Sequence, residues 1–351
     1  MSSDSLSRRS FMLGLGAMVA TIPLASCTSA PTQSDPPVAT GDAAPTSSGP
    51  APTGRWLSGA SDESAADGSF GEWRGRPVEV VGTWIDTTVE SQINGIGRAI
   101  GPASKWSNWT GPLDIAVGAI FAGETWADAA TGSYDDRWAA ALQTLKDQWG
   151  ERDPANLYIR FAHEFNGNWY PWSVRPDEIE DFKRSWNRFT ERTRKLLPTA
   201  KMVWSGNSGT RWDYDVRTAF PGVDTVDVVS VDWYNSYPFV ESADGFAEKI
   251  DLVEANGGPI GVEQWRRFAE SVGLPLAISE WSSAAADSGG GGGDSPVFFE
   301  LFHAWLAEHS GPAAGQVLYE VLFNVPGYES KFELYPETSQ PTAAEKYREL
   351  W

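Results

Sequence analysis

Cysteine, histidine and positive charge are all scarce in this sequence. One Cys and three His among 351 residues exclude an intrachain disulfide and a Cys-based zinc cluster. Lys and Arg number 27 against 47 Asp and Glu, which gives a formal charge of −20. Nucleic acid is therefore not expected as a partner, and a strongly anionic substrate is disfavoured, because both need clustered positive charge. No ligand cluster predicts a metal or any other cofactor.

Hydrophobic and aromatic side chains are plentiful by contrast. Hydrophobic residues make up 41% of the chain, enough for a sizeable core and against wholesale disorder. The chain carries 18 Trp and 10 Tyr, an excess that calls for a structural or functional reason.

Residues 1–26 have the pattern of an export signal rather than of a folded segment. Arg8-Arg9 precedes an apolar run at 11–24 that is short for a membrane span and resembles a twin-arginine signal. The run leads into Leu-Ala-Ser-Cys ending at Cys27, which resembles a lipoprotein cleavage box. This resemblance implies cleavage before Cys27 and lipid on its sulfur, hence a membrane partner. The expected location is the outer face of the cell membrane, or the secreted state. An ordinary signal peptide with an incidental Cys is the alternative.

Residues 27–54 form a predicted disordered tether, because Thr, Ser, Ala, Pro and Gly cannot bury enough apolar area to offset ordering entropy. Residues 55–351 alternate short apolar runs with amphipathic stretches. Strands are predicted over 56–58, 77–85, 113–121, 156–163, 201–205, 226–233, 276–279 and 316–323. The clearest predicted helices cover 135–149, 176–197, 262–272 and 296–309.

Strands alternating with helices predict an α/β fold, a (β/α)₈ TIM barrel, for residues 55–351. A doubly wound open sheet is the alternative. It is less favoured because no Gly-rich phosphate loop follows the first strand. The Gly-rich run 289–293 is predicted to be a mobile loop on the active face of the barrel.

The strongest chemical pattern lies at 158–172. An apolar strand ends in His163-Glu164, and a polar loop with Trp169 and Trp172 follows. Acids at the carboxyl ends of barrel strands point into the catalytic mouth, and aromatic rings beside an acid suit the C–H faces of a sugar. A zinc-protease motif is excluded because Gly167 stands where the second His is required. Core packing of the Trp residues remains an alternative.

A second acid, Glu280, ends another apolar strand and is followed by Trp281. Hydrolysis of a glycosidic bond needs two carboxylates across a shared site, and a separation of roughly 5 Å gives retention of configuration. We therefore interpret Glu164 and Glu280 as a catalytic pair. A structural ion pair between Glu164 and Arg160 is the alternative.

The motif Arg-x-x-His-Glu-x-Asn-Gly-x-Trp-Tyr-Pro-Trp at 160–172 resembles the signature of glycoside hydrolase family 26. Segments 203–207 and 226–235 resemble its fifth and sixth strands, and the likeness covers roughly 56–351. The resemblance implies a (β/α)₈ barrel with the acid/base on strand four and the nucleophile on strand seven. It also implies a retaining endo-β-glycanase, with β-1,4-mannan favoured and β-1,3-1,4-glucan or β-1,3-xylan as alternatives.

Carried over by position, the resemblance makes Glu164 the acid/base and Glu280 the nucleophile. It implies that His163 binds sugar beside the cleavage point and that Tyr234 hydrogen-bonds the nucleophile. Trp169 and Trp172 would then build a sugar platform.

Further candidates are weaker. Arg160 is a candidate donor to the nucleophile, and Trp281 is a candidate for contact with substrate. Asn207 and Asp232 are candidates for binding sugar hydroxyls, with a turn or cap role as the alternative. The family's strand-eight Trp is missing; the run here ends in Phe323, a candidate substitute.

Two further readings keep the barrel but change the function. One is a surface-tethered protein that binds glycans without hydrolysing them, and the other is an enzyme that trims the cell's own envelope or exopolysaccharide. Retention of both acids disfavours the first, because binding alone needs neither.

Overall fold

The computed structural model describes residues 55–61, 63–85, 95–285, 291–327 and 331–351. The predicted export signal, the lipid site at Cys27 and the tether lie outside these residues, as do residues 289 and 290 of the Gly-rich run. Among the described residues, no helix is long and apolar enough to cross a membrane.

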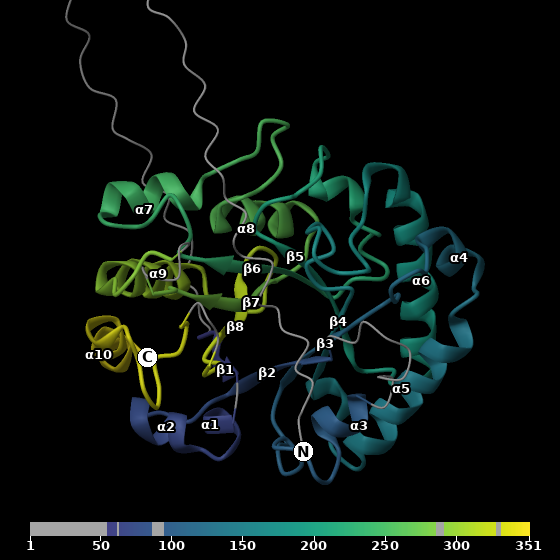
Figure 1. Ribbon diagram of the computed structural model, residues 1–351, viewed down its shortest axis with the longest axis horizontal. Helices are drawn as coiled ribbons and strands as arrows, with labels where there is room; N and C mark the ends of the chain where they lie inside the picture. The colour runs from purple at the N-terminus through teal and green to yellow at the C-terminus, as the bar shows by residue number, and fades with distance from the viewer. Residues whose placement is uncertain (1–54, 62, 86–94, 286–290, 328–330) are drawn as a thin grey trace, which may run out of the picture.

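Parallel strands pair in chain order and β8 returns to β1, so the sheet closes into a barrel (Figure 1). Closure confirms the (β/α)₈ prediction and excludes the doubly wound open sheet. The strands are β1 (Leu57–Ser61), β2 (Val80–Ile85), β3 (Leu113–Val117), β4 (Leu157–Phe161), β5 (Lys201–Asn207), β6 (Val228–Tyr234), β7 (Leu276–Ser282) and β8 (Val317–Leu322).

Helices surround the barrel in the ring seen in Figure 1. The four predicted helices are present as α5, α6, α8 and α9, with the first turn of the second one, Pro176–Glu178, in 3-10 form. The α-helices are α1 (Glu63–Ala66), α2 (Ser69–Arg74), α3 (Gly95–Ile100), α4 (Trp126–Thr131), α5 (Asp135–Trp149), α6 (Ile179–Leu196), α7 (Ala243–Ile250), α8 (Val262–Ser271), α9 (Pro296–His309) and α10 (Pro341–Leu350).

The barrel interior changes character along its axis. Near the amino ends of the strands it is filled by apolar side chains, among them Val80, Tyr158 and Tyr319. One layer further on it becomes charged, because Arg160 follows Tyr158 on the same face of β4. The charged layer therefore lies between the packed core and the carboxyl ends of the strands, where barrel enzymes carry their sites.

Candidate active site

Glu280 is buried on β7 and is held by three donors from three other strands. The phenol of Tyr234 donates to its Oε2 at 2.8 Å, and Nη1 of Arg160 donates to its Oε1 at 3.1 Å. The indole N–H of Trp84, at the end of β2, donates to the same Oε1. A cation and two neutral donors favour the ionised form of a carboxyl group. The arrangement suits a nucleophile.

A β-bulge in β7 turns Glu280 into the barrel. The pairing of β6 with β7 passes from Val231–Ile278 to Asp232–Glu280, so Ser279 is an extra residue. Ser279 itself faces inward, since its hydroxyl donates to Asp114 at 2.6 Å. Without the extra residue, regular alternation would point the next side chain outward.

The same bulge sends Trp281 out of the barrel, which corrects the expectation that this residue contacts substrate. Its ring is fully buried against Phe302 of α9 and Trp351, and its N–H donates to Glu320. Three of the other Trp residues at strand ends, Trp126, Trp204 and Trp233, are also buried in the outer core. Most of the aromatic excess at the strand ends is therefore packing.

Beneath Glu280, the guanidinium of Arg160 is shared among buried carboxylates. Its Nε donates to Asp114, and its Nη1 lies 3.4 Å from Oδ2 of Asp232 as well as close to Glu280. Burial, and then the charge of Glu280, hold the pKa of Asp232 well above its usual range. Burial also raises the pKa of Asp114. Arg160 thus positions the nucleophile from below instead of reaching the substrate.

Glu164 follows β4, and its side chain accepts hydrogen bonds from two neutral donors. The indole N–H of Trp169 donates to Oε2 at 3.0 Å, and Nδ2 of Asn207 donates to Oε1 at 3.0 Å. Its backbone takes the left-handed conformation, with φ of 51°, which is uncommon for a non-glycine residue and marks local strain. Its N–H donates to the carbonyl of Ser205, which ties the strained turn to β5.

A reciprocal amide clamp fixes the Asn207 side of this turn. The amide of Asn166 donates to the Asn207 carbonyl at 2.8 Å and accepts from the Asn207 N–H at 2.8 Å. Nothing in the sequence singles out Asn166 beyond its place in the motif. Its role is to hold Asn207 so that Asn207 can hold Glu164.

Both candidate acids act electrostatically on the same two buried groups, Asp232 and Tyr234. The charges of Glu280 and Glu164 both raise the pKa of Asp232, and both also raise the pKa of Tyr234, for which burial is the largest cause. Glu164 and Glu280 therefore share an electrostatic environment at the barrel mouth, although they lie 116 positions apart in the sequence.

The loop after Glu164 stacks its aromatic residues in layers. Tyr170 lies parallel to Trp172, with ring centroids 4.3 Å apart, and the His163 ring packs on Tyr170 at 4.9 Å. Trp172 is fully buried and donates its N–H to the His163 carbonyl at 2.9 Å. This position corrects the expectation that Trp172 forms a sugar platform: it supports the His163-Glu164 turn. Trp169, only partly buried, remains at the mouth.

An apolar wall stands beside Glu280. Phe323, which follows β8, lies 5.2 Å from the Trp84 ring and 6.2 Å from that of Tyr234, and Phe332 packs on both Phe323 and Tyr234. Phe323 is thus next to two donors of the nucleophile. The sequence singled out neither Trp84 as a donor to Glu280 nor Phe332 as part of this wall.

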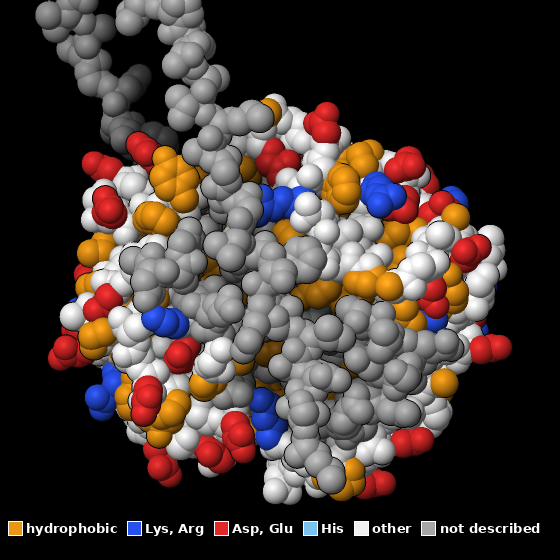
Figure 2. Space-filling model, viewed as in Figure 1, with side chains coloured by type: hydrophobic (Ala, Val, Ile, Leu, Met, Phe, Trp, Pro, Cys, Tyr) orange, Lys and Arg blue, Asp and Glu red, His pale blue; other side chains and the backbone are white. Residues whose placement is uncertain are grey.

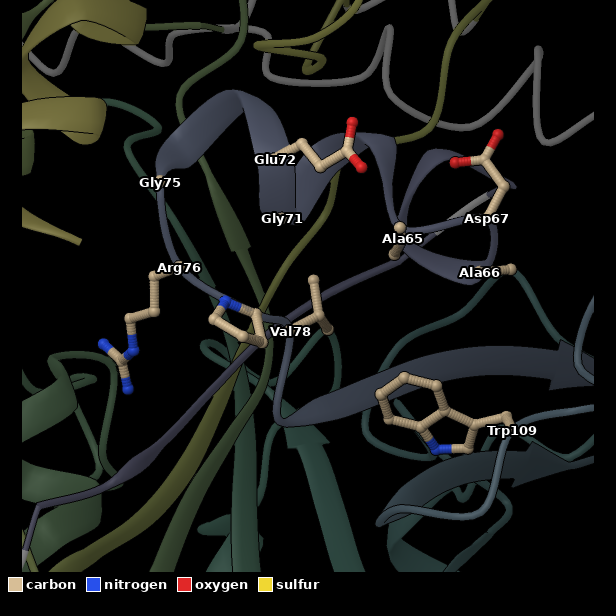
Figure 3. A pocket seen from close by; sticks show the side chains of 11 residues that line it. Ala65, Ala66, Asp67, Gly71, Glu72, Gly75, Arg76, Val78 and Trp109 are labelled. Carbon is tan, nitrogen blue, oxygen red and sulfur yellow. The ribbon is translucent and has the colours of Figure 1, made fainter.

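A separate cavity of about 640 Å³ is lined by none of the candidate site residues. It lies between the α1–α2 segment and the turn before β3, with Glu72 and Asp67 on one side and Trp109 on the other (Figure 3). Arg76, also in its lining, is paired with Glu79. Within the described ranges, no group of His, Cys, Asp or Glu could hold a metal ion.

Comparison with known proteins fits this geometry. Residues 113–259, which include Glu164 but not Glu280, match the family model described as glycosyl hydrolase family 26. No curated protein matches the sequence.

Solved structures share the fold at low identity. The catalytic domain of the family 26 endo-β-1,4-mannanase of Bacillus sp. JAMB-750 has a TM-score of 0.54 at 14% identity, over 84% of this chain and 85% of that one. GH26C from Muricauda sp. MAR_2010_75 has a TM-score of 0.52 at 14% identity over the same shares. A broad-specificity GH5-4 endoglucanase from Clostridium longisporum has a TM-score of 0.53 at 10% identity, over 83% and 86%.

The barrel and the family match identify this protein as a glycoside hydrolase, whose substrate is a polysaccharide or oligosaccharide. The family match covers residues 113–259, which is less than half of the chain.

Proposed function

We propose that the protein is a retaining endo-β-glycanase acting on a neutral polysaccharide, with β-1,4-mannan as the first candidate. The main observation in support of the mechanism is that the two acids accept hydrogen bonds from different kinds of donor. Glu280 receives a guanidinium and two neutral donors, whereas the donors to Glu164 are an indole and an amide. The family match and the mannanase named among the structures of the same fold support mannan.

In the proposed mechanism, Glu164 protonates the leaving oxygen while the Glu280 carboxylate attacks the anomeric carbon. The glycosidic C–O bond breaks, and a glycosyl ester forms on Glu280. Glu164, now ionised, takes a proton from water, which attacks the anomeric carbon; the bond from that carbon to the carboxylate oxygen of Glu280 breaks and Glu280 is released. Arg160 and Tyr234 keep the nucleophile ionised and correctly aimed throughout.

The test uses Glu164→Gln and Glu280→Gln, with Glu270→Gln on α8 as a control for a glutamate outside the site. Reducing-sugar release is measured on soluble β-1,4-mannan, β-1,3-1,4-glucan and β-1,3-xylan. Each site variant is expected to lose at least about 100-fold in kcat/KM. Full activity in either variant would overturn the mechanism. NMR of the first product should show the β configuration, and an α product would exclude retention.

Product lengths distinguish endo from exo action. An endo enzyme releases a range of oligosaccharides early in the reaction, whereas an exo enzyme releases one short product throughout. Absence of hydrolysis on every polymer, together with retained binding, would favour the non-catalytic glycan-binding alternative.

We also propose export of the protein and a lipid anchor on Cys27, which rest on the sequence pattern of residues 1–27. The test compares wild type with Cys27→Ser in a bacterial host with a twin-arginine pathway. Wild type should partition with membranes and carry a lipid mass on its first residue, while Cys27→Ser should not. Membrane partitioning of both forms alike would contradict the anchor.

A further inference from the structure

Two exposed aromatic rings lie together just after β6. Tyr237 is 75% exposed and Phe239 is 36% exposed, and their rings meet edge to face with centroids 5.8 Å apart. Among the described residues, the other large hydrophobic side chains that are exposed are the aliphatic Val223 and Val253. Single exposed apolar residues need no explanation, but a mutually packed aromatic pair is a recognition feature.

The backbone that carries these rings is firmly held. The ammonium of Lys249, itself buried, donates to the carbonyls of Ser236 at 2.6 Å and Pro238 at 3.1 Å, on either side of Tyr237. Oδ1 of Asn235 accepts from the N–H of Val240 at 3.0 Å, which closes the loop at its far end. The rings are therefore exposed on a rigid support, and a ligand would meet them already ordered.

The loop is continuous with the active site. It begins directly after Tyr234, which holds Glu280, and the N–H of Asn235 donates to the carbonyl of Ser282 at the end of β7. The loop lies beside α7, where hydrophobic side chains reach the surface in Figure 2. A chain molecule bound across the mouth between β6 and β7 would pass over this loop.

We propose that Tyr237 and Phe239 form an aromatic subsite for one sugar unit of the polysaccharide, away from the cleavage point. The inference rests on the proposed function and adds a binding site to it. Sugar C–H faces pack on exposed rings, and an uncharged ligand suits a chain of formal charge −20. The same charge opposes a second copy of the chain as the occupant, because like charges repel.

The test measures kcat and KM of the full chain on soluble β-1,4-mannan and on manno-oligosaccharides of increasing length. Variants are Tyr237→Ala, Phe239→Ala and Tyr237→Phe, and Val223→Ala, before the amino end of β6, is the matched exposed control. Each alanine variant should raise KM for the polymer about 3- to 10-fold. Val223→Ala should match wild type, and Tyr237→Phe, which keeps the ring, should raise KM less than Tyr237→Ala does. The kcat/KM for the shortest oligosaccharide that is cleaved should not change in any variant.

Two outcomes would overturn the subsite: unchanged KM for long substrates in both alanine variants, or an equal loss on short and long substrates. A change in sedimentation of the alanine variants, with unchanged kinetics, would instead mark the pair as a self-association surface. Retardation in native gels containing mannan tests the subsite without hydrolysis. If wild type cleaves nothing, but mannan retards wild type and not Tyr237→Ala, the proposed function fails and the subsite stands. If wild type cleaves mannan and the variants behave as wild type, only the subsite fails.

Discussion

The phenol of Tyr234 donates to Oε2 of Glu280 at 2.8 Å, while Arg160 and Trp84 both donate to Oε1. Oε1 of the candidate nucleophile thus accepts from residues on β4 and β2. Of the three donors, only Tyr234, on β6, donates to Oε2. Fixing both oxygens sets the rotation of the carboxylate plane. That orientation decides whether a lone pair faces the anomeric carbon.

Tyr234→Phe should therefore keep the fold and lower kcat. Phenylalanine retains the ring contacts with Phe323 and Phe332 but removes the donor to Oε2. A hydrogen bond to a charged group contributes about 1.5–3 kcal/mol, so we expect kcat/KM to fall roughly 10- to 100-fold. Steady-state kinetics on the best polysaccharide measure the loss, with the unfolding temperature as the control for structure. Wild-type kcat in this variant would show that Oε2 needs no donor.

Trp169→Phe tests the other acid. The substitution keeps a ring at the mouth and removes the indole N–H that donates to Oε2 of Glu164. If this donor orients the general acid, the loss should be largest for poor leaving groups, because those need protonation most. We expect a roughly 10-fold or greater drop in kcat on polysaccharide and a smaller one on an aryl glycoside with a good leaving group. Equal losses on both substrates would indicate that Trp169 acts through sugar binding alone.

The barrel and the position of both candidate acids at strand ends could be predicted from sequence because each rests on a local pattern. Apolar runs mark the strands, and an acid directly after such a run marks a strand end. The direction of a side chain depends on exact register, which those patterns do not fix. Trp281 shows the difference: one extra residue at Ser279 brings Glu280 inward and turns Trp281 toward α9.

Hydrogen-bond partners that lie far apart in the sequence could not be predicted, for a second reason. Trp84 reaches Glu280 across 196 positions and Trp56 reaches Glu320 across 264, and no spacing rule links such residues. Glu320 could be placed on strand eight, yet its partners come from β7 and from segments flanking β1 and α10. Burial makes these partners obligatory, because a buried carboxyl group without donors would be costly.

Asp232→Asn should flatten the dependence of stability on pH. Burial and the charge of Glu280 hold the pKa of Asp232 well above its usual range, so the folded protein keeps a proton there. The unfolded chain releases that proton above about pH 4. Unfolding therefore releases a proton in this window, and the free energy of unfolding falls as pH rises through it, up to the folded pKa. Asparagine carries no such proton and removes this contribution.

Denaturant unfolding of both proteins at a series of pH values measures this difference. The buried Asp114, whose pKa burial also raises, is present in both proteins and contributes to the slope of each. Because asparagine copies the protonated acid in shape and charge, kcat/KM measured below the folded pKa of Asp232 should stay within about 10-fold of wild type. An unchanged slope, or a loss comparable to that of Glu280→Gln, would show that Asp232 is ionised.

Trp351 should stabilise the barrel without affecting chemistry. Its N–H donates to Oε1 of the buried Glu320 at 3.0 Å, which also accepts from Trp56 at 3.4 Å, and Oε2 accepts from Trp281. Its ring stacks on that of Tyr347, with centroids 4.9 Å apart. Trp351→Ala loses the ring and the donor, so we expect the free energy of unfolding to fall by about 3–5 kcal/mol.

Trp351→Phe separates the two contributions, because it keeps a ring and removes only the N–H. Leaving one oxygen of a buried carboxyl group with a lost donor should cost about 1–3 kcal/mol. Urea unfolding measures both variants, and Glu349→Gln, in the exposed ion pair with Lys346, is the neighbouring control with an expected change below about 1 kcal/mol. The kcat of each folded variant should equal that of wild type, because Glu320 and its three indole donors face the helices and not the mouth. If Trp351→Phe is as stable as wild type, the indole N–H does not stabilise Glu320, and ring packing alone secures α10 to the barrel.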